Sequence, residues 1–205
     1  MSYSVLKPKI IVVDTDGVLI DFNKFFDKFI KDRFGKNKLA LIFHRISMKV
    51  NSFDFISNSY STLLLILLMY SVIGFKNFFK LKKEFIMYYE DYLECNKENI
   101  KQMIIGIRDS EKKPTLVFVK SNNPYARKIV DIDGCNGFIF AKNWGYFKRV
   151  VGIYKDVKII GNNFIDDMLP GKLLKIPHYY IGTSPMKKFF HATKNYETLE
   201  SFLRN

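Results

Sequence analysis

The distribution of apolar residues changes twice along the chain, and each change marks a different kind of secondary structure. Short, continuous runs of β-branched and aromatic residues are typical of buried strands, and they occur at residues 9–14, 115–120, 137–141, 157–160 and 178–181. Segments of helical length follow the later runs, at residues 123–130, 144–155 and 166–174. Strands that alternate with helices predict an α/β fold in which helices cover both faces of a Rossmann-like parallel sheet.

Residues from about 20 to 113 interrupt this alternation, because their apolar residues recur every three or four positions. Phenylalanine and isoleucine keep this spacing from Phe22 to Phe34, and Gly35 is the expected C-cap of an amphipathic helix. Further helices are predicted at residues 39–50, 60–73, 78–93 and 97–108. We therefore expect residues 1–20 and 113–205 to form the core domain, and residues 21–112 to form an inserted all-α domain.

One part of the inserted region is unusually apolar, with no charged residue from Phe55 to Phe75. Its strongly apolar portion begins only at Leu63 and is shorter than the roughly 20 residues that span a bilayer. A buried helix is the first interpretation of this segment, and a membrane-surface or re-entrant segment is the alternative. No transmembrane segment is expected.

The composition of the chain indicates what kind of protein it is, and its charge indicates which partners it can bind. Of the 205 residues, 48% are hydrophobic and 16% aromatic, which is enough to bury a core. The formal net charge of +13 favours anionic partners such as phosphorylated metabolites, nucleic acid or an acidic membrane surface. AT-rich codon use is the alternative explanation for the excess of basic residues.

Cys95 and Cys135 are far apart and indicate neither a disulfide framework nor a zinc site. The N-terminal apolar run ends at Asp14, too early for a signal peptide, so a cytoplasmic location is expected.

Polar residues directly follow three of the predicted strands, at the ends where parallel sheets place their chemistry. The first group, Asp14-Thr15-Asp16-Gly17, follows residues 9–13. Two carboxylates two residues apart can divide the work of attacking phosphorus and transferring protons, and Gly17 permits a tight turn beneath them. A simple Asp-Gly turn is the alternative.

The other two groups could bind phosphate and metal. Ser121 and Asn122 end the second strand, where a hydroxyl and a helix N-terminus can bind phosphate oxygens or merely cap the helix. The third group, GNNFIDD from Gly161 to Asp167, supplies oxygen ligands of the kind that suit magnesium. For Asp166, a helix N-cap is the alternative.

Together, the order and spacing of these groups resemble the motifs of the haloacid dehalogenase (HAD) superfamily. The DxDG first motif reads DTDG at residues 14–17, Ser121 matches the second motif, and residues 161–166 read GNNFID where the family has GDxxxD. The resemblance implies a HAD core with a helical cap of the C1 type inserted between the first two motifs. It also implies a magnesium-dependent phosphatase, a hydrolase that acts on a small phosphorylated substrate through an aspartyl-phosphate.

The resemblance also assigns roles to individual residues. Asp14 would be the nucleophile, Asp16 the general acid and base, and Ser121 with Asn122 would hold the phosphoryl oxygens. Magnesium would be bound by Asp14, the backbone carbonyl of Asp16, Asn162 and Asp166. The acid at position 16 favours phosphate chemistry over dehalogenation, because an alkoxide leaving group needs a proton and a halide does not.

Two features leave alternatives open. The family's third motif is a lysine, for which Lys142, directly after the third strand, is preferred over Lys148 in the next helix. Asn162 replaces the usual first acid of the fourth motif and removes one negative charge from the metal site. A weakened HAD-fold protein that binds a phosphorylated ligand or nucleic acid is therefore an alternative, as is a phosphomutase. No motif supports nucleic-acid binding, and the substrate and oligomeric state are not predicted.

Overall fold

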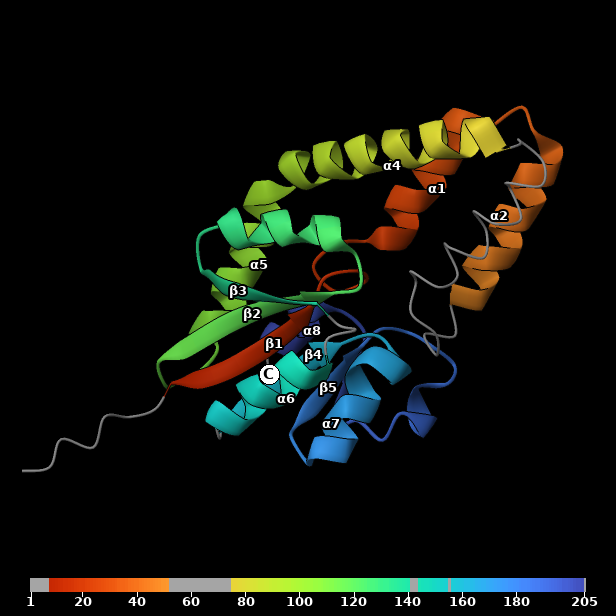
Figure 1. The fold of residues 1–205 in the computed structure, drawn as a ribbon. Helices are drawn as coiled ribbons and strands as arrows, with labels where there is room; N and C mark the ends of the chain where they lie inside the picture. The colour runs from red at the N-terminus through yellow and green to blue at the C-terminus, as the bar shows by residue number, and fades with distance from the viewer. Residues whose placement is uncertain (1–7, 52–74, 141–143, 155, 205) are drawn as a thin grey trace, which may run out of the picture.

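The structure, a computed structural model, describes residues 8–51, 75–140, 144–154 and 156–204. Its centre is one six-stranded sheet in the order β3-β2-β1-β4-β5-β6, in which all neighbouring strands are parallel (Figure 1). The strands are β1 (Lys9–Asp14), β2 (Thr115–Ser121), β3 (Cys135–Phe140), β4 (Val157–Gly161), β5 (His178–Ile181) and β6 (Lys194–Tyr196). The Rossmann-like α/β fold and its five predicted strands are confirmed. The short β6 is an addition that the sequence does not predict, because its residues KNY are polar and largely exposed.

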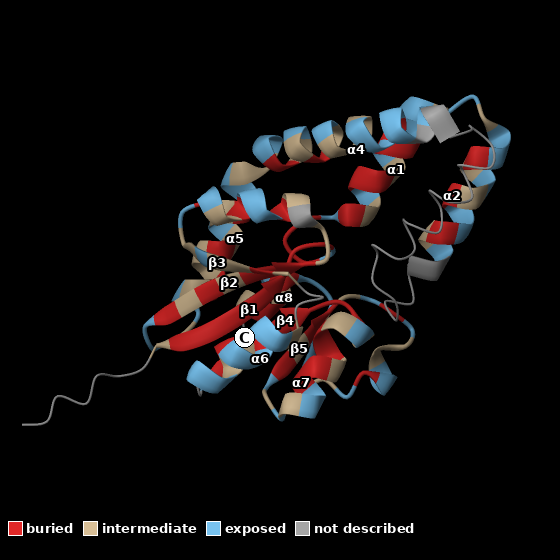
Figure 2. Ribbon diagram, viewed as in Figure 1, coloured by how far each residue is buried: buried red, intermediate tan, exposed pale blue. Residues whose placement is uncertain are grey.

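Alternate residues of the central strand serve two separate layers of the core. Ile11 and Val13 pack in one cluster with the inserted helices, whereas Ile10 and Val12 pack in a second cluster on the other face. All four side chains are fully buried, and Figure 2 shows β1 as buried along its length. A strand buried on both faces needs a continuous apolar run, and this is why KIIVV reads so clearly in the sequence. The strand carries Asp14 to the carboxyl edge of the sheet.

Helical segments follow each of the later strands. They are η1 (Pro124–Asp131), α6 (Trp144–Ile153), η2 (Phe164–Met168), α7 (Leu169–Leu174), η3 (Lys187–Phe189) and α8 (Leu199–Leu203). Two of the predicted helical segments are not regular α-helices along their whole length. Residues 124–131 form a 3₁₀ helix, and the segment after β4 begins with a π-helical turn in which the Met168 N–H donates to the Asn163 carbonyl. Propensity and spacing do not distinguish such short helical forms from an α-helix.

The described part of the insertion consists of four helices. They are α1 (Phe22–Phe34), α2 (Lys38–Asn51), α4 (Phe75–Cys95) and α5 (Lys97–Asp109). The predicted helix at residues 60–73 lies outside the described residues. Gly35 is the C-cap of α1, as expected, but its backbone is right-handed, so the left-handed freedom of glycine is not used there.

Aromatic side chains join α1 to α4, which lie side by side in Figure 1. The Phe25 ring contacts four rings of α4, with centroid separations from 5.1 to 5.6 Å, namely those of Phe85, Tyr88, Tyr89 and Tyr92. By contrast, α5 packs on the sheet through Ile100, Ile104 and Ile107, which are fully buried with the residues of β1 and β2. The boundaries of the core and the inserted domain remain a prediction.

Among the helices in the described parts of the chain, none is both long enough and apolar enough to cross a bilayer. The apolar segment from residue 63 onward lies outside those parts up to residue 74. Its expected burial therefore remains a prediction.

Candidate active site

The loop after β1 is held tightly against the neighbouring strand β2. Thr15 donates two hydrogen bonds to the Lys120 carbonyl, one from its N–H and one from its hydroxyl, each 2.9 Å long. The Gly17 N–H closes the turn by donating to the Ile20 carbonyl at 2.7 Å. Gly17 has φ +95°, and a Cβ there would lie 1.8 Å from Asn162 Nδ2. The glycine of DTDG is therefore required both by its backbone conformation and by the close approach of Asn162.

The sequence-predicted residues on three separate loops lie together at the carboxyl edge of the sheet. The Ser121 hydroxyl donates to Asp16 Oδ2 at 3.2 Å, which joins the loops after β1 and β2. Asn122 Nδ2 donates to Asp166 Oδ2 at 2.6 Å, which joins the loops after β2 and β4. Asp14 ends β1 in register with the penultimate residue of β2. These contacts place the candidate nucleophile, general acid, phosphate ligand and metal ligand in one group.

A buried lysine that no sequence motif indicated lies within this group. Lys120 is only 3% exposed, and its ammonium donates to the Asp167 carboxylate and to the Asp166 carbonyl. The preferred candidate, Lys142, lies outside the described residues. Lys148 is exposed, and its ammonium lies 5.4 Å from the centre of the Trp144 ring. Of the lysines in the described residues, we therefore assign Lys120 to the candidate site.

The two adjacent acids of the loop after β4 occupy different environments. Asp167 is fully buried, and its Oδ2 accepts a hydrogen bond of 2.9 Å from the Asn163 N–H. A Cβ on Gly161 would lie 2.2 Å from the Asp167 carboxyl, so a glycine at the end of β4 makes room for this acid. Asp166, the predicted metal ligand, is half-buried. Asp167, which belongs to the predicted group of oxygen ligands without a role of its own, is the acid that pairs with Lys120.

Burial and mutual repulsion dominate the electrostatics of the group. Burial, followed by the charge of Asp167, raises the pKa of Asp14 well above its ordinary value, and Lys120 opposes the shift. Burial also raises the pKa of Asp167, again against Lys120. Burial alone would lower the pKa of Lys120, but Asp167 and then Asp14 raise it above the ordinary lysine value. The group is therefore short of positive charge even with the ammonium in place.

Asp16 has a different environment, made of hydroxyl groups. Its Oδ2 accepts from Ser121, and its Oδ1 accepts from the hydroxyl of Tyr89 on α4 at 3.2 Å. Burial raises the pKa of Asp16 to about 6, and the hydrogen bonds from Ser121 and Tyr89 limit the shift. An acid with a pKa near neutrality can both give and take a proton under physiological conditions. Tyr89 is a second residue that no sequence motif indicated.

The oxygen donors of the group are of the kind that magnesium prefers. Within the described residues, no three His, Cys, Asp or Glu side chains lie close enough together to hold a metal by themselves. Magnesium, however, is usually bound by one or two carboxylates, with water and substrate phosphate completing its shell. Burial and then the charge of Asp167 raise the pKa of Asp14, and a divalent cation would favour its charged form. Asp14 and Asp166 with the Asp16 carbonyl could supply such a site, whereas the Asn162 amide lies against Gly17.

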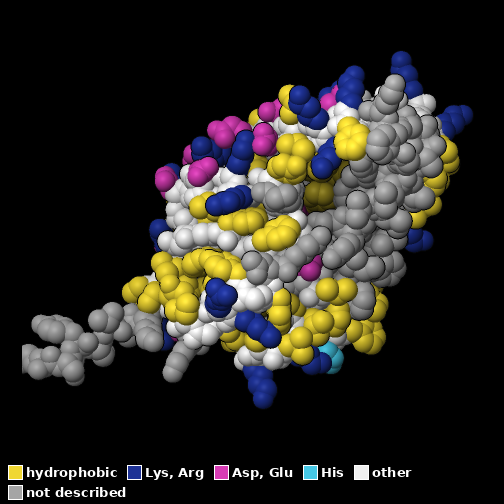
Figure 3. Space-filling view, in the orientation of Figure 1, with side chains coloured by type: hydrophobic (Ala, Val, Ile, Leu, Met, Phe, Trp, Pro, Cys, Tyr) yellow, Lys and Arg dark blue, Asp and Glu magenta, His cyan; other side chains and the backbone are white. Residues whose placement is uncertain are grey.

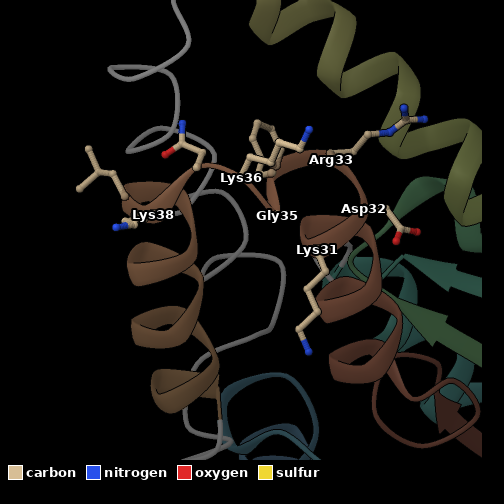
Figure 4. Close-up of a pocket in the computed structure, with 9 residues that line it drawn as sticks. Lys31, Asp32, Arg33, Gly35, Lys36 and Lys38 are labelled. Atoms are coloured by element: carbon tan, nitrogen blue, oxygen red, sulfur yellow. The ribbon is translucent and has the colours of Figure 1, made fainter.

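Two hollows lie near these elements, but neither contains the reacting groups. A cavity of about 570 Å³ borders Gly17 and Asn162 and is otherwise lined by polar and apolar residues of the loop after β1, of α1, α4 and α5, and of the segment 181–200. A second hollow, of about 900 Å³, surrounds the turn between α1 and α2 (Figure 4). Its basic side chains do not converge, since Lys31 and Lys36 point to opposite sides of the turn in Figure 4. Among the described residues on the face shown in Figure 3, Lys and Arg side chains are likewise scattered and form no continuous basic stripe.

Known structures share this architecture along almost the whole chain, although no family model and no curated relative matches the sequence. L-2-haloacid dehalogenase from Xanthobacter autotrophicus has a TM-score of 0.60 and 13% identity, over 96% of this chain and 97% of that one. YfnB from Bacillus subtilis, assigned to the HAD hydrolases and bound to magnesium, has a TM-score of 0.59 and 10% identity, over 97% and 98% of the two chains. Phosphoserine phosphatase from T. onnurineus has a TM-score of 0.54 and 13% identity, over 100% and 96%. The chain therefore has the HAD fold.

Proposed function

We propose that this chain, which has the HAD fold, is a magnesium-dependent phosphomonoester hydrolase that forms an aspartyl-phosphate on Asp14. The observation that carries the proposal is the buried group in which Asp14 lies with the acid Asp16 and the ammonium of Lys120. Phosphoryl transfer through the enzyme needs a nucleophile, a proton donor and positive charge for the phosphoryl oxygens. One edge of the sheet supplies all three.

The chemistry proceeds in two displacements at phosphorus. First, a carboxylate oxygen of Asp14 bonds to phosphorus, while the bond from phosphorus to the ester oxygen breaks and Asp16 gives its proton to that oxygen. Asp16, now a carboxylate, then takes a proton from water as the water oxygen bonds to phosphorus and the bond from phosphorus to the Asp14 oxygen breaks. Inorganic phosphate leaves, and both acids return to their starting states. The pKa of about 6 suits Asp16 for both directions of proton transfer.

The remaining residues bind and orient the phosphoryl group. Lys120 faces the carboxylates of Asp14 and Asp167, so its ammonium can neutralise phosphoryl oxygens brought to Asp14. The Ser121 hydroxyl can donate to one of these oxygens. Magnesium, when bound, supplies positive charge that reduces the repulsion between the Asp14 carboxylate and an anionic phosphate. The inserted helices would act as a C1 cap that selects a small substrate.

The residue at position 16 distinguishes phosphatase from dehalogenase chemistry. The Asp16 carboxyl is buried and held by two hydroxyl groups, which is suitable for a group that transfers protons. A departing halide needs no proton, whereas a departing alkoxide does. We therefore favour phosphate esters as substrates, although a dehalogenase has the same fold.

A phosphatase screen with and without magnesium tests the proposal directly. We expect the purified protein to release phosphate from p-nitrophenyl phosphate and from some members of a panel of small phosphate esters, and we expect EDTA to stop the reaction. Adding magnesium back should restore it, because the carboxylates around Asp14 need a cation before they can accept a second anion. Failure to release phosphate from any ester in the presence of magnesium would contradict the proposal.

Asn162→Asp tests whether the departure from the fourth motif weakens the metal site. The added carboxylate should lower the magnesium concentration for half-maximal activity by about tenfold, equivalent to roughly 1.4 kcal/mol. In EDTA the same variant should melt at a lower temperature, because Asn162 is buried against Gly17, next to Asp16, and a charge there would have no cation to offset it. Magnesium titrations of activity and of melting temperature measure the two effects.

The control for this variant adds the same charge elsewhere. Asn195 is exposed on the edge strand β6, so Asn195→Asp should change neither the magnesium titration nor the melting temperature in EDTA. Equal magnesium dependence in Asn162→Asp and the wild type would show that position 162 is not near the metal.

A further inference from the structure

Tyr89 brings a hydroxyl group from the inserted helices into the candidate active site. Its side chain is fully buried, and its hydroxyl donates to Asp16 Oδ1 at 3.2 Å across 73 residues of sequence. Buried hydroxyl groups need hydrogen-bond partners. This one has as its partner the carboxyl group to which we assign proton transfer.

Ring packing and a second hydrogen bond fix the position of this hydroxyl. The Phe25 ring on α1 meets the Tyr89 ring at 83° with centroids 5.3 Å apart, and the Phe85 ring stacks on it at 6.4 Å. Asn123 contributes a side-chain hydrogen bond to the Tyr89 hydroxyl. The Asn123 amide is itself oriented, because its Oδ1 accepts from the Tyr125 N–H at 3.0 Å. The Tyr89 hydroxyl is therefore held in place from α1, from α4 and from the loop after β2.

The two hydroxyl groups on Asp16 differ in what else they can do. Ser121, at the end of β2, is the residue expected to donate to a phosphoryl oxygen, and when it does so it releases Asp16 Oδ2. Tyr89 lies within the aromatic contacts between α1 and α4, so its hydroxyl stays on Oδ1. One oxygen of the carboxyl group would then remain anchored while the other becomes free.

We propose that Tyr89 is a positioning residue for proton transfer, because its hydroxyl anchors Asp16 Oδ1 so that Oδ2 faces the leaving-group oxygen. The inference rests on the proposed phosphatase function and extends it to the inserted helices. In the first displacement the proton on Oδ2 moves to the ester oxygen as the phosphorus–oxygen bond breaks, and Tyr89 keeps its own proton throughout. The arrangement favours phosphate esters whose leaving groups must be protonated.

Tyr89→Phe removes the anchoring hydroxyl and keeps the ring. We expect kcat/KM for phenyl phosphate to fall about tenfold more than kcat/KM for p-nitrophenyl phosphate, because only the poorer leaving group depends strongly on the proton from Asp16. The loss should appear in kcat, with little change in KM, since Tyr89 contacts the acid and not the phosphoryl group. In an Asp16→Asn background, Tyr89→Phe should cause no further loss with p-nitrophenyl phosphate.

Tyr88→Phe is the matched control. It removes the same hydroxyl from the neighbouring residue, whose ring also contacts Phe25 but whose hydroxyl donates to Asp32 at 3.0 Å. Both esters should be hydrolysed at the wild-type rate by this variant. Equal losses with the two esters in Tyr89→Phe, or losses that add to those of Asp16→Asn, would overturn the inference and leave the phosphatase function standing. Wild-type protein that hydrolyses neither ester with magnesium would overturn both.

Discussion

Asp14→Asn should abolish magnesium-dependent phosphate release and, in EDTA, should raise the melting temperature of the protein. Asparagine has the size of aspartate but cannot form the aspartyl-phosphate, so we expect kcat to fall by roughly 10³- to 10⁶-fold, the range that removal of a nucleophile produces. Steady-state phosphate release from p-nitrophenyl phosphate measures this loss. Activity equal to that of the wild type would remove Asp14 from the mechanism.

The rise in stability follows from the direction of the pKa shift. Burial and Asp167 raise the pKa of Asp14 in the folded protein. At neutral pH an acid with a raised pKa lowers the free energy of unfolding, because folding either buries its charge or takes up a proton that the unfolded chain does not bind. This penalty appears as the pH rises through the ordinary pKa of aspartate, and asparagine removes it. Each 1 kcal/mol gained should raise the melting temperature by roughly 2–4 °C for a chain of this length.

Two controls separate this effect from a general effect of charge removal. Asp91 is exposed on α4, and Asp91→Asn should leave both activity and melting temperature close to those of the wild type. Magnesium should raise the melting temperature of the wild type more than that of Asp14→Asn, because the variant lacks one of the proposed ligands. A variant that melts well below the wild type in EDTA would contradict the electrostatic account of Asp14.

The strands and the first site residues could be predicted from the sequence because their causes are local. A strand buried on both faces must be apolar throughout, so KIIVV and its counterparts stand out as continuous runs. In a parallel sheet the residues after such runs lie at one edge, so Asp14, Ser121 and Asp166 could be grouped before their contacts were known. The spacing of aromatic residues from Phe22 to Phe34 predicted α1 on the same kind of evidence.

Lys120 and Tyr89 could not be identified in this way, because their roles depend on contacts between distant segments. A lysine at the end of TLVFVK looks like the solvated end of a strand. Only the strand order, with β2 between β3 and β1, makes it an interior position beside Asp14. Tyr89 looks like one more aromatic residue on an amphipathic helix, and the aromatic contacts between α1 and α4 bring it to Asp16. A signal for Lys120 existed in the sequence, since a charged residue at the end of a central strand needs a buried counter-charge.

Lys120→Met should have the second largest effect, and it should reduce both stability and activity. The substitution keeps an unbranched side chain but removes the cation that pairs with Asp167 in a fully buried position. Breaking a buried ion pair leaves a charge without compensation, for which we expect the free energy of unfolding to fall by about 3–5 kcal/mol. The loss of positive charge at the phosphoryl group should lower kcat by roughly 10²- to 10³-fold. Urea denaturation and phosphate release measure the two losses.

Lys101→Met is the matched surface variant. Lys101 on α5 pairs with Asp133 at 2.8 Å, so the variant also removes the cation of a Lys–Asp pair, but at an exposed position where water screens the interaction. It should change neither urea denaturation nor phosphate release appreciably. A similar loss of stability in Lys101→Met and Lys120→Met would mean that burial is not the source of the effect.

Combining Lys120→Met with Asp167→Asn separates the two roles of the lysine. If the loss of stability comes from the uncompensated Asp167 carboxylate, neutralising Asp167 in the same molecule should restore much of the free energy of unfolding. Activity should stay low, because the phosphoryl oxygens would still lack the ammonium. If Asp167→Asn does not restore the free energy of unfolding, Lys120 acts mainly through the packing of its side chain. Restored stability together with restored activity would show that the cation serves the fold and not the phosphoryl group.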